Sequence, residues 1–288
     1  MAIFVKFPKH DTLVSSMKTT LSLNTGVEIP ILGYGTWQLK GDECMRSTTK
    51  ALEIGYRHID TAAMYDNHAE IAKVLESSNL KRDELFIVSK VWRDSLHHQG
   101  VLDACRRALD ELRIDYLDLY LIHWPDRKIP IAETLEAMQE LKDKGLIKAC
   151  GVSNFTIRHI QDAVDTGIQF SNNQVEFHPT LNQKELKDFC DQHHIVMTAY
   201  SPIGRGEDLN HRTIQQLTEK YSRSPSQVIL NWILNKDIVA IPKAANPDHI
   251  VDNFKTLEWN IAPEDSQLID EIDQYSRLAN PDFSDFDY

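Results

Sequence analysis

Short apolar runs alternate along the chain with longer stretches in which apolar residues recur at helical spacing. Helical spacing is clearest at residues 99–112, where Leu102, Cys105, Leu109 and Leu112 fall on one face. Because helical stretches separate the short runs, the pattern predicts parallel strands and a (β/α)8 TIM barrel. The eight predicted strands are residues 31–37, 57–60, 85–91, 117–123, 147–152, 173–177, 195–199 and 238–241. Further helices are predicted at residues 42–54, 69–77, 131–144, 213–221, 225–235 and 263–275.

The two ends of the chain depart from this alternation. Asn24-Thr25-Gly26 lies between apolar residues and predicts a β-hairpin over residues 21–30. Residues 1–20 lack the long apolar core of a signal peptide, so we interpret them as an extension before a single barrel domain of residues 21–288. The tail, residues 276–288, mixes Asp with Phe and Tyr, and is either a disordered end or a flap over the barrel mouth.

Composition narrows the class of partner. The formal net charge of −12 at pH 7 argues against nucleic acid or an anionic membrane. No run approaches the ~20 apolar residues that cross a bilayer. The 4 cysteines are widely spaced and form no C-x-x-C, which favours reduced thiols. We therefore expect a cytoplasmic monomer. The residues described next indicate that its partner is a small-molecule carbonyl compound.

Four polar residues lie at or just after the carboxyl ends of three consecutive predicted strands, where barrel enzymes carry their catalytic groups. An ammonium beside a phenol favours phenolate, so Lys90 is expected to lower the pKa of Tyr65 from about 10 and make it a usable general acid. Asp60 would neutralise Lys90, and His123 would orient a carbonyl oxygen. The four candidates are Asp60, Tyr65, Lys90 and His123.

Each candidate also has a structural interpretation, as a rim ion pair, a packed aromatic or a histidine at a strand end. Their coincidence on three neighbouring strands favours catalysis. The remaining histidine candidates, His97-His98, His178 and His193-His194, lack the H-x-H or H-x-x-x-H spacing of ligand sets, so no metal is predicted. Without an obvious nucleophile or metal, a site that polarises carbonyls needs a reductant carried by a cofactor.

The later predicted strands suit such a cofactor. Residues 153–154 supply a hydroxyl and an amide, Gln174 supplies a second amide, and these groups suit a carboxamide. Tyr200 can stack on a planar ring, and the glycine-containing residues 201–206 can approach a pyrophosphate. Lys243 follows the last predicted strand, where barrel enzymes often hold phosphate.

Several separated motifs give the chain a family resemblance. They are Gly55-Tyr56-Arg57-His58-Ile59-Asp60-Thr61-Ala62 with Tyr65, the strand of Lys90, residues Tyr116–Pro125, Gly151-Val152-Ser153-Asn154-Phe155 and Ala199-Tyr200-Ser201-Pro202. In this order they resemble the aldo-keto reductases, over nearly the whole chain from Leu21 to the tail. The compact loops and Arg277-Leu278-Ala279 are most similar to the bacterial 2,5-diketo-gluconate and methylglyoxal reductases of that family.

The resemblance implies an NADPH-dependent reductase of small aldehydes, ketones or α-dicarbonyls, with hydride from nicotinamide and Tyr65 as general acid. It implies that Trp37, Trp92 and Trp124 wall the substrate pocket. The cofactor-binding residues that it implies are Gly35, Thr36, Ser153, Asn154, Gln174, Tyr200, Ser201, Pro202, Ile203, Gly204, Lys243, Ala244, His249 and Asn253.

One motif departs from the family pattern. The family usually has Ser after the Lys and Arg five residues later, whereas this chain has Ala244 and His249 after Lys243. Imidazole lacks the permanent charge and forked geometry of guanidinium. We expect NADPH to be favoured over NADH less strongly than usual, and its affinity to fall as His249 loses its proton. NADH therefore remains a candidate second cofactor.

Other functions fit parts of the same pattern. Lys90 suits a barrel aldolase that forms a Schiff base, which borohydride trapping with a carbonyl substrate would reveal. A regulatory or redox-sensing subunit that binds nicotinamide is a second alternative, and a scaffold without catalysis is a third. Oxidation of the cofactor by a panel of aldehydes would distinguish these two from the reductase.

Overall fold

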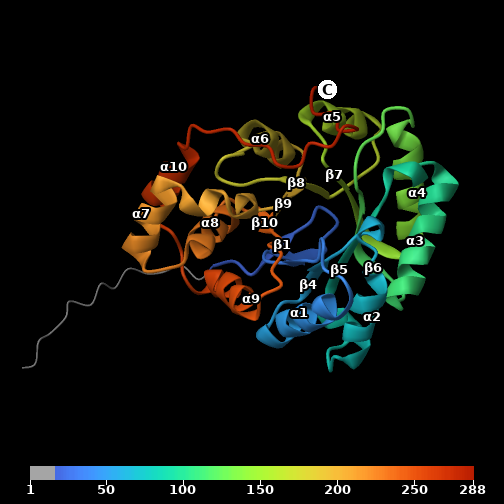
Figure 1. Cartoon of the computed structure of the whole chain (residues 1–288). Helices are drawn as coiled ribbons and strands as arrows, with labels where there is room; N and C mark the ends of the chain where they lie inside the picture. Colours follow the sequence, from blue (N-terminus) through green and yellow to red (C-terminus); the bar gives the residue numbers. More distant parts are fainter. Residues whose placement is uncertain (1–16) are drawn as a thin grey trace, which may run out of the picture.

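The structure, a computed structural model, describes residues 17–288 and is built around eight parallel strands with helices outside them (Figure 1). Strand order in the sheet follows the chain from β3 to β10, as expected when each strand is followed by a helical return. The strands are β3 (Tyr34–Gly35), β4 (His58–Asp60), β5 (Phe86–Val91), β6 (Leu117–Ile122), β7 (Ile147–Ser153), β8 (Asn172–Glu176), β9 (Val196–Tyr200) and β10 (Val239–Ala240).

The sheet closes into a barrel between its first and last strands. Leu32 forms a parallel bridge with Ala240, whose carbonyl accepts a 2.8 Å hydrogen bond from the amide of Gly33. Residues 31–33 therefore bond to β10, while residues 34–35 pair with β4. This division explains why the strand predicted at residues 31–37 forms only a two-residue ladder with β4. The predicted (β/α)8 barrel is confirmed.

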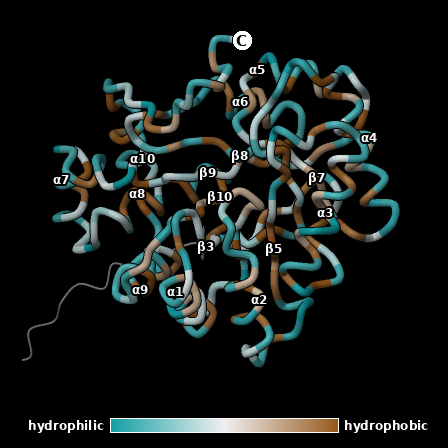
Figure 2. Tube along the Cα trace, turned by 45° about the vertical axis from the view of Figure 1, so that its right-hand side comes forward, coloured by the Kyte–Doolittle hydropathy of each residue, from teal (hydrophilic) through white to brown (hydrophobic). Residues whose placement is uncertain are grey.

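Most helices have one buried face, whereas every residue of α8 (Pro225–Leu234) from Gln227 onward is buried. In α3, all four residues of the predicted apolar face are buried. Apolar residues from the strands and the helices form one core cluster. Brown, hydrophobic segments accordingly recur along both strands and helices in Figure 2. The helices are α1 (Gly41–Ile54), α2 (His68–Ser77), α3 (His98–Leu112), α4 (Ile131–Asp143), α5 (Ile157–Asp165), α6 (Lys184–Gln192), α7 (Arg212–Tyr221), α8 (Pro225–Leu234), α9 (Pro247–Phe254) and α10 (Pro263–Asp270).

The predicted hairpin is present and covers the amino-terminal end of the barrel. Its strands, β1 (Thr20–Ser22) and β2 (Glu28–Pro30), are antiparallel, with Leu21 opposite Ile29. The side-chain amide of Asn24 donates to the carbonyl of Phe170, just before β8, at 3.0 Å. Residues 1–16 of the predicted extension lie outside the described residues. Within residues 17–288, no helix combines the length and apolar character that a membrane crossing requires.

The carboxyl-terminal segment differs from its predicted helix. Helix α10 ends at Asp270, short of the predicted Tyr275, because the following backbone bonds to the barrel instead of to itself. The amide of Ser276 donates to the carbonyl of Thr180 at 2.8 Å. Beyond it the tail runs across the top of the barrel in Figure 1, from α10 past α6 to α5. Of the two alternatives for the tail, the flap is therefore correct.

Candidate active site

A buried ion pair lies at the carboxyl ends of β4 and β5. Nζ of Lys90 donates to Oδ1 of Asp60 at 2.6 Å and to the carbonyl oxygen of Thr61 at 2.8 Å. The exposed fractions of the Lys90 and Asp60 side chains are 0% and 2%. A buried ammonium is costly unless it is paired and hydrogen-bonded, so these acceptors hold Lys90 in one position.

Tyr65 lies beside this pair, in the 3-10 turn η1 (Ala63–Tyr65) that follows β4. Its hydroxyl is 3.4 Å from Nζ of Lys90. Its ring meets the His123 ring edge-on, with 5.6 Å between the ring centroids. The structure thus brings together all four residues that were predicted to form the catalytic group.

Asn67 fixes the loop that carries Tyr65. Its side-chain amide donates to the carbonyl of Thr36 at 3.0 Å, and its side-chain oxygen accepts from the hydroxyl of Thr61 at 2.6 Å. Asn67 is fully buried, so these bonds are shielded from competing water. The sequence reasoning missed this residue because an Asn in a loop has no distinctive spacing.

The electrostatics correct one prediction. Burial raises the pKa of Tyr65 well above 10, and the charge of Asp60 acts in the same direction. Burial also lowers the pKa of Lys90, an effect that Asp60 opposes. The expected lowering of the Tyr65 pKa by Lys90 was therefore wrong, because desolvation dominates and Asp60 neutralises the ammonium. Tyr65 is a protonated phenol in this site.

His123 follows β6 and is held as a neutral imidazole. Burial lowers its pKa well below 6.5, and the charge of Lys90 adds to the effect. Its carbonyl accepts a 2.9 Å hydrogen bond from the side chain of Asn154. Its Nδ1 is buried and has no hydrogen-bond partner among residues 17–288. A neutral imidazole keeps one ring N–H that can donate a hydrogen bond.

Polar side chains connect these four residues to the cofactor-binding candidates on β7, β8 and β9. Nε2 of Gln174 donates to Oδ2 of Asp60 at 2.8 Å. The Asn154 amide donates to Oγ of Ser153 at 3.1 Å, and its oxygen accepts from the Tyr200 hydroxyl at 2.7 Å. The candidate catalytic residues and these cofactor-binding candidates therefore adjoin one another. The Tyr200 ring is partly exposed.

The loop after β9 is a compact turn with an unusual backbone. Positive φ angles occur at Ser201 (47°), Gly204 (57°), Arg205 (52°) and Gly206 (100°). The amide of Gly204 donates to the carbonyl of Ser201, and that of Gly206 to Ile203, both at 2.9 Å. Left-handed turns of this kind form backbone concavities that accept anions. Pro202 is buried under the turn.

The candidates after β10 lie around the start of α9. Lys243 is exposed, whereas Ala244 is buried and its carbonyl accepts a 2.6 Å hydrogen bond from Tyr34. His249 is exposed in the first turn of α9, and Asn253 is buried farther along it. A cation beside a helix amino terminus suits a phosphate.

Gly35 and Thr36 contact neighbouring strands. A Cβ at Gly35 would lie 2.7 Å from the carbonyl oxygen of Ile241, so the close approach of β10 requires glycine there. The Thr36 hydroxyl donates to the carbonyl of Asp60 at 2.9 Å. Both residues thereby support the strand ends that carry the candidate site.

Taken together, the donor set fits a nicotinamide dinucleotide. The partly exposed ring of Tyr200, whose hydroxyl is bonded to the Asn154 side chain, suits a nicotinamide and its carboxamide. The left-handed turn at residues 201–206 suits a pyrophosphate, and exposed Lys243 suits a further phosphate.

Aromatic rings wall the other side of the site. Trp92 meets His123 at a centroid distance of 5.1 Å. Phe283 of the tail meets Trp92 at 5.7 Å and Trp124 at 5.4 Å, in both cases edge-on. Trp37 is 36% exposed and lies under the guanidinium of Arg205. Trp92 and Trp124 therefore adjoin the site through His123 and Phe283, a wall residue that sequence reasoning had not assigned, whereas the contact of Trp37 is with the loop after β9.

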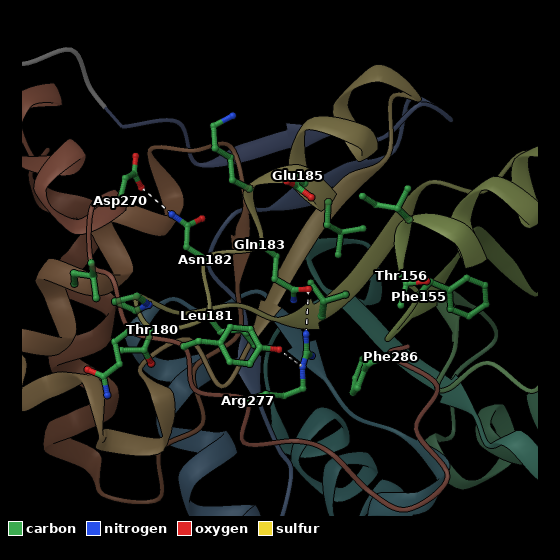
Figure 3. A pocket seen from close by; sticks show the side chains of 18 of the residues that line it. Phe155, Thr156, Thr180, Leu181, Asn182, Gln183, Glu185, Asp270, Arg277 and Phe286 are labelled. Carbon is green, nitrogen blue, oxygen red and sulfur yellow. Dashed lines mark hydrogen bonds between the residues drawn. The ribbon is translucent and has the colours of Figure 1, made fainter. Parts of the chain in front are cut away.

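A separate pocket of about 1110 Å³ lies beside the barrel mouth, between α5, α6, α10 and the tail (Figure 3). The Arg277 side chain projects into it, and its guanidinium donates to Gln183 at 3.5 Å and to Tyr275 at 3.2 Å. None of the four candidate catalytic residues lines this pocket, so it is not the site of the proposed chemistry.

Comparison with known proteins gives the chain a family. The family model described as the aldo/keto reductase family matches residues 31–274. The chain belongs to the aldo-keto reductase family. It is 40% identical over 271 residues to glyoxal reductase of Bacillus subtilis, with 93% of this chain and 98% of that protein covered. It is 38% identical over 269 residues to methylglyoxal reductase DkgA of Escherichia coli K12, with 92% and 97% covered.

Solved structures agree with this assignment. An aldo-keto reductase from a Medee basin deep-sea metagenome library superposes with a TM-score of 0.88 at 33% identity, over 90% of this chain and 97% of that one. Aldose reductase of Schistosoma japonicum gives a TM-score of 0.86 at 32% identity, over 90% and 94%. This aldo-keto reductase is accordingly an NAD(P)H-dependent oxidoreductase that acts on carbonyl groups.

Proposed function

We propose that this aldo-keto reductase uses NADPH to reduce small aldehydes, ketones and α-dicarbonyls, with Asp60, Tyr65, Lys90 and His123 as its catalytic residues. The observation that carries the proposal is the convergence of these residues: a phenol 3.4 Å from a buried ammonium, which is itself 2.6 Å from a carboxylate. A bound nicotinamide supplies the hydride. The chain's own residues supply orientation and a proton.

Tyr65 is the proton donor in this proposal. Its raised pKa keeps the phenol protonated until negative charge develops on the carbonyl oxygen. An alkoxide is a stronger base than a phenolate, so transfer becomes favourable as the alkoxide forms. Nζ of Lys90 lies close enough to stabilise the phenolate that remains, and Asp60 holds Lys90 in place.

His123 orients the carbonyl group. As a neutral imidazole it donates one hydrogen bond without adding a second cation beside Lys90. Trp92, Trp124 and Phe283 form an apolar wall next to it, which excludes water from the reacting carbonyl.

The preference for NADPH is proposed to be weak. Lys243 can pair with a 2′-phosphate, but Ala244 offers no hydroxyl and His249 no permanent charge. The remaining cofactor contacts are assigned to Ser153, Asn154, Gln174, Tyr200 and residues 201–206.

The substrate class is proposed from both the wall and the relatives. The two bacterial relatives are named for their reduction of glyoxal and methylglyoxal. Small dicarbonyls also suit a mouth that three aromatic rings narrow. The protein is proposed to act as a monomer in the cytoplasm; the four buried free cysteines are consistent with a reducing compartment.

Oxidation of NADPH and NADH in the presence of methylglyoxal, simple aldehydes, aldoses and keto-gluconates tests the proposal. The expected result is saturable oxidation with methylglyoxal or another small aldehyde, faster with NADPH. Cofactor binding without oxidation by any compound would instead indicate the regulatory subunit. The Schiff-base aldolase is disfavoured because Lys90 is fully buried and bonded to Asp60 and Thr61.

A further inference from the structure

A second cluster of buried charges lies outside the catalytic group, at the end of β8. Its members are Glu176, His178 and Asp208, whose side chains are at most 2% exposed. The His178 ring lies between the two carboxylates: Nε2 is 2.9 Å from Oε1 of Glu176, and Nδ1 is 2.8 Å from Oδ2 of Asp208. None of these residues contacts the four catalytic candidates through a hydrogen bond that the structure shows among residues 17–288.

The geometry requires a charged ring. Both nitrogens of His178 face carboxylate oxygens, so both must carry a proton to donate, which makes the ring an imidazolium. Burial alone would lower the pKa of His178, but the hydrogen bonds to Asp208 and Glu176 outweigh it and raise the pKa. One cation thus joins two buried anions that come from different segments.

One end of the cluster holds the tail. Oε1 of Glu176 accepts from the amide of Leu278, and Oε2 accepts from the amide of Ala279, both at 2.7 Å. Both carboxylate oxygens are therefore occupied by tail backbone. The aromatic residue Phe283, which walls the substrate side of the mouth, lies a few residues farther along the same tail.

The other end holds the loop after β9. Asp208 lies in the short 3-10 turn η5 (Asp208–Asn210) that follows this loop. A Cβ at Gly204 would lie 2.8 Å from the carboxyl carbon of Asp208, so the loop backbone rests directly on this carboxylate. Thr180 holds the Asp208 side chain in place, because its hydroxyl donates to Oδ1 of Asp208 at 2.7 Å.

We propose that Glu176, His178 and Asp208 form a clasp that positions the tail and the loop of residues 201–206 together, so that order in one stabilises order in the other. The three are positioning residues, since none of them bonds to Asp60, Tyr65, Lys90 or His123, and they act through the segments that they hold in place. The proposed function is the basis for placing the cofactor at the loop and the substrate at the tail. The mechanical coupling between loop and tail does not depend on it. Such coupling is reciprocal.

Hydrogen exchange tests the coupling without any assay of activity. Asp208→Asn replaces one carboxylate oxygen, an acceptor at the loop end of the clasp, with an amide NH2 group. Amide hydrogen exchange should then become about fivefold faster at residues 276–288 of the tail. In Ala279→Pro, the tail loses one donor, and exchange should become about fivefold faster at residues 201–210 of the loop. Ala279→Pro lies in a surface segment, so it tests the coupling even if the core variant fails to fold.

Asp118→Asn is the matched control. Asp118 is also a buried carboxylate, bound by Arg82 at 2.7 Å and by Lys148 at 3.0 Å, but it lies at the opposite end of the barrel. Its variant should change exchange in neither segment. Exchange that accelerates only next to each substitution, with the other segment unchanged in both variants, would overturn the clasp.

A kinetic measurement connects the clasp to the proposed reaction. With methylglyoxal as substrate, Ala279→Pro should raise the KM for NADPH about fivefold and change kcat by less than about twofold, because the four catalytic candidates and their mutual contacts are unchanged. An unchanged KM for NADPH would contradict a functional role for the coupling. If the wild-type chain oxidises no cofactor, the proposed function fails while the exchange result still decides the clasp.

Discussion

Tyr65 and its neighbours illustrate how burial sets the chemistry of single residues. The spacing of Asp60, Tyr65, Lys90 and His123 could be read from the sequence, because barrel strands deliver their ends to one face. The direction in which the Tyr65 pKa is shifted could not be read in this way. It depends on how completely the phenol is desolvated and on Asp60 neutralising Lys90, and both follow from the packed structure.

The proposed weak preference for NADPH rests on two positions, Ala244 and His249. Replacing both residues in the double variant Ala244→Ser, His249→Arg supplies a hydroxyl and a permanent charge, and should raise the ratio of kcat/KM for NADPH over NADH about tenfold. Steady-state kinetics with both cofactors checks it. Gln99→Arg, which adds the same charge at an exposed position of α3, should leave this ratio unchanged. An unchanged ratio in the double variant would contradict the role proposed for these two positions.

The barrel strands and most helices follow from periodicity, whereas their ends depend on contacts between distant segments. The short ladder of β3 arises because residues 31–33 bond to β10 instead of β4. Helix α10 stops early because the backbone that follows it bonds to Glu176, the last residue of β8, and to Thr180 just beyond. Neither partner is close in sequence, so no local pattern could have revealed these boundaries.

At the amino-terminal end of β6, Asp118 joins three elements. Besides Arg82 and Lys148, it accepts from the amide of Ile87 in β5 at 2.9 Å. Asp118→Asn should therefore lower the free energy of unfolding by about 2 kcal/mol, with little change in turnover. Urea denaturation of the variant measures the loss. Asp103→Asn, at an exposed carboxylate on α3, is the control, and an equal loss in both variants would refute this role.

Buried histidines determine how the stability of the folded chain responds to acid. Folding lowers the pKa of four of them, so the unfolded chain binds their protons first and stability falls as pH drops below about 6.5. His178 has the opposite sign: its contribution is present below that pH and is lost as pH rises through its raised pKa. The four are His58, His68, His123 and His159.

Because four histidines have lowered pKa values and only His178 has a raised one, the urea midpoint should decrease from pH 7.5 to 5.5. Equilibrium unfolding at closely spaced pH values, followed by intrinsic fluorescence at constant ionic strength, gives this dependence. A midpoint that stays constant or increases toward pH 5.5 would show that these four histidines are not held neutral.

The comparison of wild-type chain with Tyr65→Phe tests the central claim most directly. The variant lacks the proton donor but keeps the ring, so NADPH-dependent reduction of methylglyoxal should fall by about a hundredfold or more. The dissociation constant of NADPH, measured by fluorescence titration, should change by less than about twofold. Reduction at the wild-type rate would contradict the assignment of Tyr65 as general acid.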